Sequence, residues 1–191
     1  SHVTSSMDRG KDDALLTIIH KSGIVEKKAA FAEGTRRLYQ LAEHGEDLKA
    51  HGLGVVEAKI VNGVYQMPYM KAESGQLYLK RLLQSDKESF LQVMDHFRNL
   101  ILQSSEIVKA DRGDGEGAVL RRGYLDLVPL NSFVVDGEFV FYDQEFCAEY
   151  YPANAIIQRM ISTFYAGNIG FQKIIPINCL YERYGLIKHL Q

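Results

Sequence analysis

Several features are scarce in this sequence of 191 residues. Cysteine occurs only twice, at Cys147 and Cys179, which is too few for a disulfide scaffold and predicts a reducing, cytoplasmic environment. No apolar run approaches the roughly 20 residues that a membrane-spanning helix requires, and the N-terminus shows no signal-peptide core. Because 22 Lys and Arg are balanced by 24 Asp and Glu, the sequence lacks the basic excess typical of nucleic-acid-binding proteins.

What remains is the composition of an ordinary globular protein. Apolar residues make up 46% of the chain and charged residues 24%, and a chain of this length buries enough surface to fold without disulfides or a structural metal. The length indicates one domain or a small two-lobed unit. Because the sequence begins with Ser1 rather than Met, it is also compatible with a fragment of a longer protein.

The first 70 residues are rich in predicted strands. Two short β-prone runs, residues 14–19 and 24–27, surround a Gly-containing turn and predict a hairpin. A helical pattern begins at Phe31, and Gly45 is a plausible stop. A second hairpin is predicted around Asn62-Gly63, because a type I′ turn needs two residues with positive φ.

The rest of the chain is mainly helical. Residues 85–88 read Ser-x-x-Glu, which predicts a capping box at the start of a helix. Asp136-Gly137 separates two β-prone runs and predicts a small hairpin. Pro152 opens a further helix, which Gly167 is expected to end. The order of elements predicts an α+β fold with a β-rich N-terminal lobe and a mainly helical C-terminal lobe, joined near residue 70.

Acidic and amide side chains cluster around the Asp136-Gly137 hairpin. Asp126 and Asn131 precede it, and Asp143 and Glu145 follow it. Phosphoryl transfer gives such a set a purpose, because the reaction depends on the positioning of charge. Asp126 would orient an attacking hydroxyl and accept its proton, while Asn131 and Asp143 would hold magnesium, which prefers oxygen ligands.

This segment resembles the kinase-like superfamily, specifically its aminoglycoside and choline kinase-like phosphotransferases. Their catalytic loop has the form H-x-D-x4-N, followed after a β hairpin by D-x-E or D-x-D. Asp126 and Asn131 match the loop, and Asp143 and Glu145 match the metal motif. Tyr124 stands where the family has its His. The resemblance implies a two-lobed protein-kinase-like fold, with residues 1–70 as the nucleotide-binding lobe and residues 71–191 as the catalytic lobe, and it implies ATP and magnesium as cofactors.

The same resemblance assigns roles in the N-terminal half. Val25-Glu26-Lys27 is similar to the V-x-K pattern of the third kinase strand, and strand alternation puts Val25 and Lys27 on one face. Lys27 is therefore the candidate phosphate-binding lysine, with Lys28 as the second choice and Glu33 as the candidate ion-pair partner. Residues 67–70 (Met-Pro-Tyr-Met) leave a strand at the position of an adenine-contacting hinge, which makes Met70 a nucleotide-binding candidate. No Gly-rich phosphate loop precedes the first hairpin; residues 5–10 occupy that place.

Other segments are similar to kinase-like domains associated with methyltransferase or glycosyltransferase enzymes of bacterial surface-polysaccharide synthesis. They are residues 25–29, 33–34, 142–146 and 180–185. The expected function is transfer of phosphate from ATP to a hydroxyl of a sugar, a polysaccharide end or another small polar molecule, with an associated or fused module of that kind as a partner. A protein acceptor is disfavoured because no long activation segment follows Asp143.

Two alternatives stay open. Tyr124 and the absent Gly-rich loop favour a catalytically degenerate pseudokinase, a nucleotide-binding interaction module of a larger polysaccharide-assembly enzyme. The other alternative is a plain α+β interaction domain, in which Asp126 only caps a loop, Asn131 only starts a strand, and Asp143 and Glu145 only end a strand in solvent. Exposed lysines are common on strands, so Lys27 has an equally plain interpretation.

Overall fold

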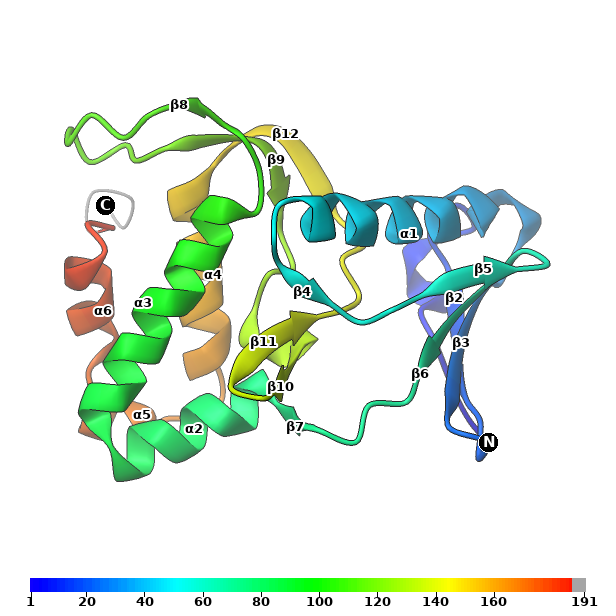
Figure 1. The fold of residues 1–191 in the computed structure, drawn as a ribbon, viewed down its shortest axis with the longest axis horizontal. Coiled ribbons are helices and arrows are strands. Elements are labelled where there is room, and N and C mark those ends of the chain that lie inside the picture. Colours follow the sequence, from blue (N-terminus) through cyan, green and yellow to red (C-terminus); the bar gives the residue numbers. More distant parts are fainter. Residues whose placement is uncertain (187–191) are drawn as a thin grey trace.

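The computed structural model describes residues 1–186. An antiparallel five-stranded sheet forms the N-terminal part, in the order β1–β2–β3–β6–β5. Figure 1 shows this sheet on the right of the view, with helix α1 (Thr35–Ala50) crossing it and the helical part on the left. The strands are β1 (His2–Ser5), β2 (Leu15–Ile19), β3 (Ile24–Ala29), β5 (Lys59–Val61) and β6 (Val64–Pro68).

Both hairpins predicted in this part are confirmed. β2 and β3 pair antiparallel, with Thr17 opposite Lys27, and the turn between them contains Gly23 at φ +86°. β5 and β6 pair through Asn62 and Gly63, at φ +50° and +76°. These positive values are those that a type I′ turn demands, which is why Asn-Gly is so strong a signal.

The predicted end of the first helix is wrong. A 3₁₀ turn, η2 (Ala32–Gly34), leads into α1, which continues through Gly45 to Ala50. Gly45 keeps a helical conformation and lies against Val55. The chain instead leaves the helix at Gly52, where φ is +84°. A glycine ends a helix when it takes a left-handed conformation, and the sequence alone did not show which glycine does so.

A second sheet joins the two parts of the molecule. β4 (Gly54–Val55) pairs parallel with β11 (Glu138–Phe141), which pairs with β10 (Ser132–Val135) and through it with β7 (Glu73–Ser74). The predicted Asp136-Gly137 turn is confirmed at φ +52° and +80°. Backbone hydrogen bonds thus link residues on both sides of the predicted lobe boundary at residue 70, and that boundary stays a prediction.

Helices fill most of the C-terminal part. The predicted capping box at Ser85 is wrong, because Ser85 is the last residue of α2 (Gly75–Ser85). Asp86 instead caps α3 (Lys87–Gln103), where its side chain accepts a hydrogen bond from the Ser89 N–H at 3.1 Å. The helix from Pro152 is confirmed, and Gly167 follows its end at φ +73°. The helices are α2 (Gly75–Ser85), α3 (Lys87–Gln103), α4 (Ala153–Tyr165), α5 (Phe171–Ile174) and α6 (Ile177–Arg183).

A third sheet was not predicted. It has the order β12–β9–β8, where β9 (Val119–Tyr124) leads directly into the segment that carries Asp126. β12 (Cys147–Pro152) begins just after Glu145 and pairs with β9, so Cys147 lies opposite Tyr124. β8 (Ile107–Lys109) forms the outer edge. This pairing brings together the two ends of residues 126–145, which we call the acidic segment.

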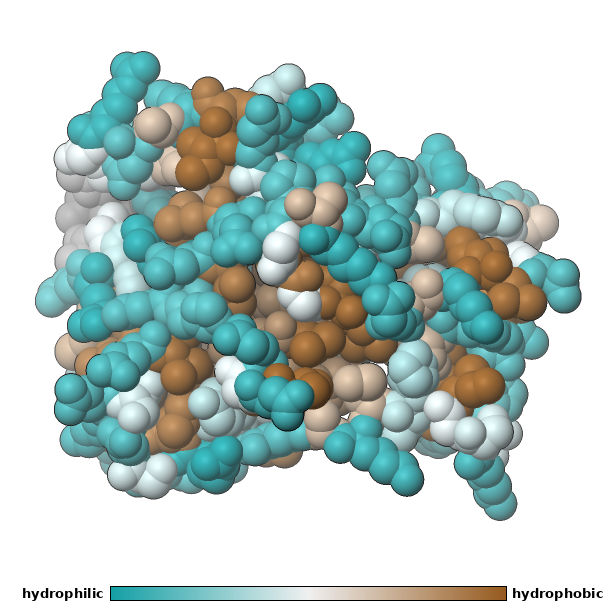
Figure 2. Space-filling view, in the orientation of Figure 1, coloured by the Kyte–Doolittle hydropathy of each residue, from teal (hydrophilic) through white to brown (hydrophobic). Residues whose placement is uncertain are grey.

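The predicted α+β class, with a β-rich N-terminal part and a mainly helical C-terminal part, is confirmed by this arrangement. Figure 2 shows that most of the face in view is hydrophilic; one apolar group lies in the middle, where β4 and β11 lie in Figure 1, and others lie on the left and right of the face. Within residues 1–186, no helix has the length and apolarity needed to span a membrane.

Candidate active site

The acidic segment folds back on itself. After β9 the chain passes Asp126 and a 3₁₀ turn, η3 (Pro129–Asn131), and the β10–β11 hairpin then returns it to Asp143. Asn131 Nδ2 donates to the Asp126 carbonyl at 3.3 Å, and Gln144 Nε2 donates to the same carbonyl at 2.9 Å. Asp126, Asn131, Asp143 and Glu145 all line one cavity of about 450 Å³.

Lys27 reaches this group from the N-terminal sheet. Its ammonium lies 2.9 Å from Asp143 Oδ1 and 3.9 Å from Glu145 Oε1, and it donates to Thr17 Oγ1 at 3.2 Å. Only 8% of the Lys27 side chain is exposed, and Val25 is buried on the same face of β3. Lys28 is 45% exposed and lies 4.0 Å from Glu26. The structure therefore gives the two lysines the opposite orientations expected from strand alternation.

A second cavity, of about 300 Å³, adjoins the first at Asp143, and we call it the hinge cavity. Its lining residues include Met67, Tyr69 and Met70, in the segment expected to be the hinge, and Lys27. Phe133 and Tyr142 stack on each other with ring centroids 4.8 Å apart and line the cavity from the C-terminal side. An aromatic and aliphatic cavity with a few polar groups at one end suits a flat heterocycle linked to an anionic tail.

Glu145 is held differently from Asp143. It is buried, and its Oε2 lies 2.5 Å from Arg9 Nη1. Burial raises the pKa of Glu145, and the nearby Asp143 charge raises it further, while Lys27 and Arg9 oppose that shift. Two carboxylates and two cations thus face one another across the junction of the lobes.

Whether magnesium suits this site depends on its oxygen atoms. Asp143 Oδ1 is buried and has no hydrogen-bond partner among residues 1–186, although Lys27 Nζ lies 2.9 Å away. Within the same residues no group of three or more His, Cys, Asp or Glu is arranged to hold a metal ion. Magnesium in nucleotide sites uses one or two protein carboxylates together with phosphate oxygens and water, and the pair Asn131 and Asp143 fits that mode. The carboxylate of Glu145 is already paired with Arg9, so its role as a ligand stays a prediction.

Asp143 has an unusual backbone conformation. Its φ is +62°, in the left-handed region that residues other than Gly, Asn and Asp seldom adopt. Such conformations persist where the surrounding structure fixes them, and they gather at functional sites. Here the Gln144 side chain donates to the Tyr142 carbonyl at 3.0 Å as well as to the Asp126 carbonyl. It therefore links the residue before Asp143 to the segment that carries Asp126.

The structure does not bring Glu33 to Lys27. Glu33 lies exposed in η2, and no ion pair within 4.0 Å joins it to Lys27 in the described part of the chain. The charged side chain that α1 directs to the site is Arg37, which pairs with Asp13 and donates to the Glu145 carbonyl at 3.3 Å. The role predicted for Glu33 has no support in this geometry.

Tyr124, at the position of the family's His, links β9 to α1. It is fully buried, its hydroxyl donates a short hydrogen bond to Asp47, and its ring meets His44 edge-on at 5.3 Å. Burial and the Asp47 charge raise the pKa of Tyr124. His44 Nδ1 in turn lies 2.7 Å from the Gln144 carbonyl. Tyr124 therefore connects β9 to α1 and does not line the cavity that contains Asp126.

Two arginines of the site were not predicted. Arg159 of α4 donates from Nε to the Leu125 carbonyl at 2.8 Å and from Nη2 to Asp126 Oδ1 at 3.2 Å. Arg9 pairs with Glu145 from a distance of 136 residues in sequence. Nothing local marks Arg159, the one charged residue of α4, but Arg9 lies within residues 5–10, which stand before the first hairpin, the position expected for a Gly-rich loop.

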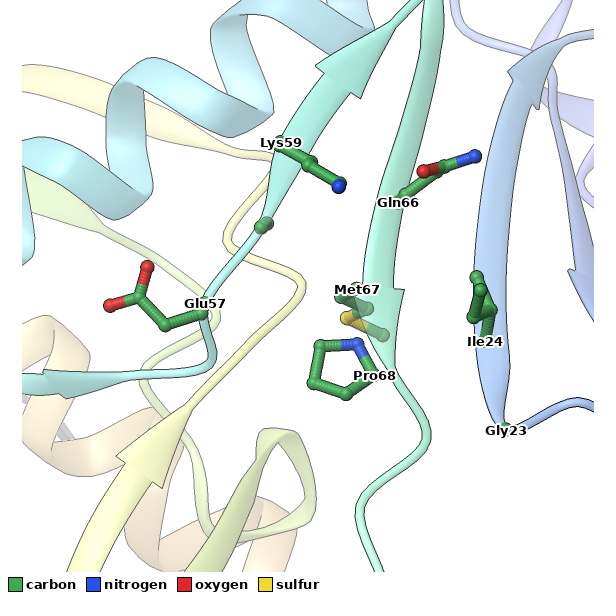
Figure 3. Close-up of a pocket in the computed structure, with 8 residues that line it drawn as sticks. Gly23, Ile24, Glu57, Lys59, Gln66, Met67 and Pro68 are labelled. Atoms are coloured by element: carbon green, nitrogen blue, oxygen red, sulfur yellow. The ribbon is translucent and has the colours of Figure 1, made fainter.

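A further cavity of about 410 Å³ lies away from Asp126. Figure 3 shows Met67 and Pro68 on β6 between Ile24 of β3 and Glu57. This cavity shares Met67 and Pro68 with the hinge cavity but has no residue of the acidic segment in its wall. It does not belong to the candidate active site.

Comparisons with known proteins concern the fold. No protein-family model matches the sequence, and no curated protein is similar to it. Among solved structures, the chain is similar to a macrolide 2′-phosphotransferase type I, with 10% identity and a TM-score of 0.48, over 97% of this chain and 77% of that one. It is also similar to the apoenzyme of macrolide 2′-phosphotransferase MphH from Brachybacterium faecium, with 14% identity and a TM-score of 0.43, over 98% and 80% of the two chains.

Proposed function

We propose that the chain is an ATP- and magnesium-dependent phosphotransferase that acts on a hydroxyl of a sugar, a polysaccharide end or another small polar molecule. The observation that best supports this is the position of Asp143, which lines three adjoining cavities. One contains the hinge residues, one contains Lys27 beneath the N-terminal strands, and one contains Asp126. A donor nucleotide and an acceptor would therefore meet at a single carboxylate.

In this proposal the hinge cavity takes the adenine, and Lys27 binds the phosphates. Magnesium, held by Asn131 and Asp143, would neutralise charge on the phosphate oxygens. Asp126 accepts the proton of the acceptor hydroxyl as its oxygen bonds to the γ-phosphorus, and the bond from that phosphorus to the β–γ bridging oxygen breaks to release ADP. Arg159, bonded to the Asp126 carboxylate, holds it in orientation.

The cavity around Asp126 supports a small polar acceptor. Its wall combines Phe146 and Tyr151 with charged side chains, and a volume of about 450 Å³ suits a molecule of one or two sugar rings better than a folded protein. The sequence resemblance at residues 142–146 and 180–185 supports a place in polysaccharide assembly, in the cytoplasm, with a methyltransferase or glycosyltransferase module as the partner.

Asp126→Asn separates this proposal from the pseudokinase alternative. A general base acts mainly in the transition state, so the variant should bind ATP as the native chain does. Its rate of phosphate release from ATP with magnesium, measured with and without added sugars, should fall by about 10²–10⁴-fold. Asp136→Asn, the same change in the exposed β10–β11 turn, is the matched control and should keep the native rate.

Equal rates for the native chain and Asp126→Asn, in a protein that binds ATP, would overturn the catalytic role. The nucleotide-binding interaction module would then be the better description of the chain. Absence of ATP binding by the native chain would overturn both and leave the plain α+β interaction domain.

A further inference from the structure

The connection between β1 and β2, residues 6–14, is closely tied to the N-terminal sheet. Leu15 N–H donates to Ser6 Oγ at 2.9 Å, and Ser6 N–H donates to the Leu15 carbonyl at 3.0 Å. Within the connection, a 3₁₀ turn, η1 (Met7–Arg9), places Arg9 at its end, where the Arg9 N–H donates to the Ser6 carbonyl at 3.0 Å. The backbone that carries Arg9 is thus fixed relative to β2.

The Arg9 side chain extends from this connection to the C-terminal part. Its Nη1 pairs with Glu145 Oε2 at 2.5 Å, and its guanidinium lies 5.5 Å from the centroid of the Phe146 ring. The Arg37 guanidinium lies 5.2 Å from the same centroid. The Arg9 side chain is nevertheless 39% exposed. Among the described residues, its side-chain hydrogen bond to Glu145 is donated by Nη1. Donors on Nε and Nη2 remain for a ligand.

Arg9 lies at the boundary between two cavities. One is a polar chamber of about 180 Å³ beneath β1 and β2, which also contains Ser5, Thr17 and Lys27. The other is the larger cavity that contains Asp126. Three residues line both: Arg9, Asp143 and Glu145, so Arg9 is the one cation common to the two walls among the described residues.

In the proposed function, the transferring phosphoryl group passes from the chamber to the cavity of Asp126. Arginine presents a planar fork of donors that matches phosphate oxygens, and a guanidinium beside a transferring phosphoryl group stabilises its charge in the transition state. Lys27, by contrast, lines the chamber and the hinge cavity but not the cavity of Asp126. The two cations therefore line successive cavities, Lys27 the hinge cavity and the chamber, and Arg9 the chamber and the cavity of Asp126.

We propose that Arg9 binds the γ-phosphate of the donor nucleotide and takes the place of the absent Gly-rich loop as the phosphate clamp. This inference rests on the proposed function, because it requires a nucleotide in the hinge cavity. Glu145 holds the guanidinium at the boundary before the nucleotide enters. Lys27 binds the inner phosphates, so the two cations have separable effects on nucleotides of different length.

Calorimetric titration with two nucleotides at fixed magnesium tests this assignment. The probes are ADP and the non-hydrolysable ATP analogue with a β–γ imido bridge. Arg9→Gln should weaken binding of the triphosphate analogue about tenfold or more, the effect of losing a charge-assisted hydrogen bond, and should change ADP binding less than about twofold. Arg9→Lys, which keeps the charge but not the fork, should lose less.

Arg183→Gln is the matched control, because it also removes a guanidinium paired with a carboxylate, Asp95 at 2.6 Å, but far from the cavities. It should bind both nucleotides as the native chain does. If Arg9→Gln lost the same affinity for both nucleotides, or lost none for either, the assignment of Arg9 would be overturned. Nucleotide binding by the native chain would still support the proposed function in that case. A native chain that binds neither nucleotide would overturn the proposed function and this inference together.

Discussion

The N-terminal and C-terminal parts of the molecule are stabilised by cores of very different size. In the C-terminal part, buried side chains form one continuous cluster that reaches from Leu48 in α1 to Leu186. In the N-terminal part, the cluster consists of Leu15, Leu38, Leu41 and Tyr65, with a few half-buried neighbours. The hydrophobic effect scales with buried apolar area, so most of the stabilisation lies in the C-terminal part.

The candidate site is divided along the same line. Asp126 and Asp143 follow β9 and β11, which contribute to the large core, and Asn131 ends the η3 turn before β10. Lys27 lies in the sheet with the small core, and Arg9 lies in the connection between two of its strands. Proteins open locally where few apolar contacts hold them, so we expect the N-terminal sheet to be the part that moves when a nucleotide enters. In the proposed function, the large core would supply a fixed platform for the chemistry, and the part with the small core would supply cations that adjust to the nucleotide.

The largest effect should come from the large core beneath the hairpin. Phe141 is fully buried and meets Phe97 edge-on at 5.4 Å. Phe141→Ala should reduce the free energy of unfolding by about 3–5 kcal/mol, measured by urea denaturation. Leu41→Ala, in the small core, should cost about 2 kcal/mol, because that part collapses around a cavity more easily. A larger loss from Leu41→Ala would contradict the comparison of the two cores.

Next in size is the effect of the buried lysine. Lys27→Ala removes a cation from the phosphate position, and we expect ATP affinity in calorimetry to fall by about 10- to 100-fold. Lys28→Ala, on the opposite face of the same strand, is the matched control and should change affinity less than about twofold. Similar losses of ATP affinity in the two variants would show that the face of β3 on which a lysine lies does not decide whether it binds phosphate.

The smallest effect concerns pH. Burial lowers the pKa of His44 below its usual value of 6.5, against the hydrogen bond to the Gln144 carbonyl. The folded state thus favours neutral His44, so its stabilising contribution is present above pH 6.5 and is lost as the pH falls below that value. Urea denaturation from pH 7.5 to 5 should show a shallower loss of stability in His44→Gln than in the native chain. Parallel curves would show that His44 does not couple α1 to the acidic segment.

Local sequence patterns predicted what depends on local chemistry. Asn62-Gly63 and Asp136-Gly137 predicted their hairpins because two residues with positive φ specify the turn. The convergence of Asp126, Asn131 and Asp143 followed from that second hairpin. Gly45 and Ser85 misled because several residues could end or cap a helix, and tertiary packing chose Gly52 and Asp86.

Contacts between segments far apart in the sequence could not be predicted from local patterns. The β9–β12 pairing joins strands separated by the whole hairpin, and neither strand has a strong period of its own. Arg159 reaches Asp126 from α4, and Arg9 reaches Glu145 from the N-terminus. Glu33 was assigned from its place in sequence, but the turn of η2 leaves it on the surface.

Magnesium-dependent stabilisation by ATP tests the central claim most directly. The account predicts that ATP with magnesium at 100 times the dissociation constant stabilises the native chain by about 2.7 kcal/mol in thermal unfolding, and that ATP alone stabilises it less. Asp143→Asn keeps side-chain size and tolerates the left-handed backbone, but it should lose the magnesium-dependent part, whereas Asp136→Asn should retain it. An Asp143→Asn variant that retains the full magnesium dependence would contradict the account.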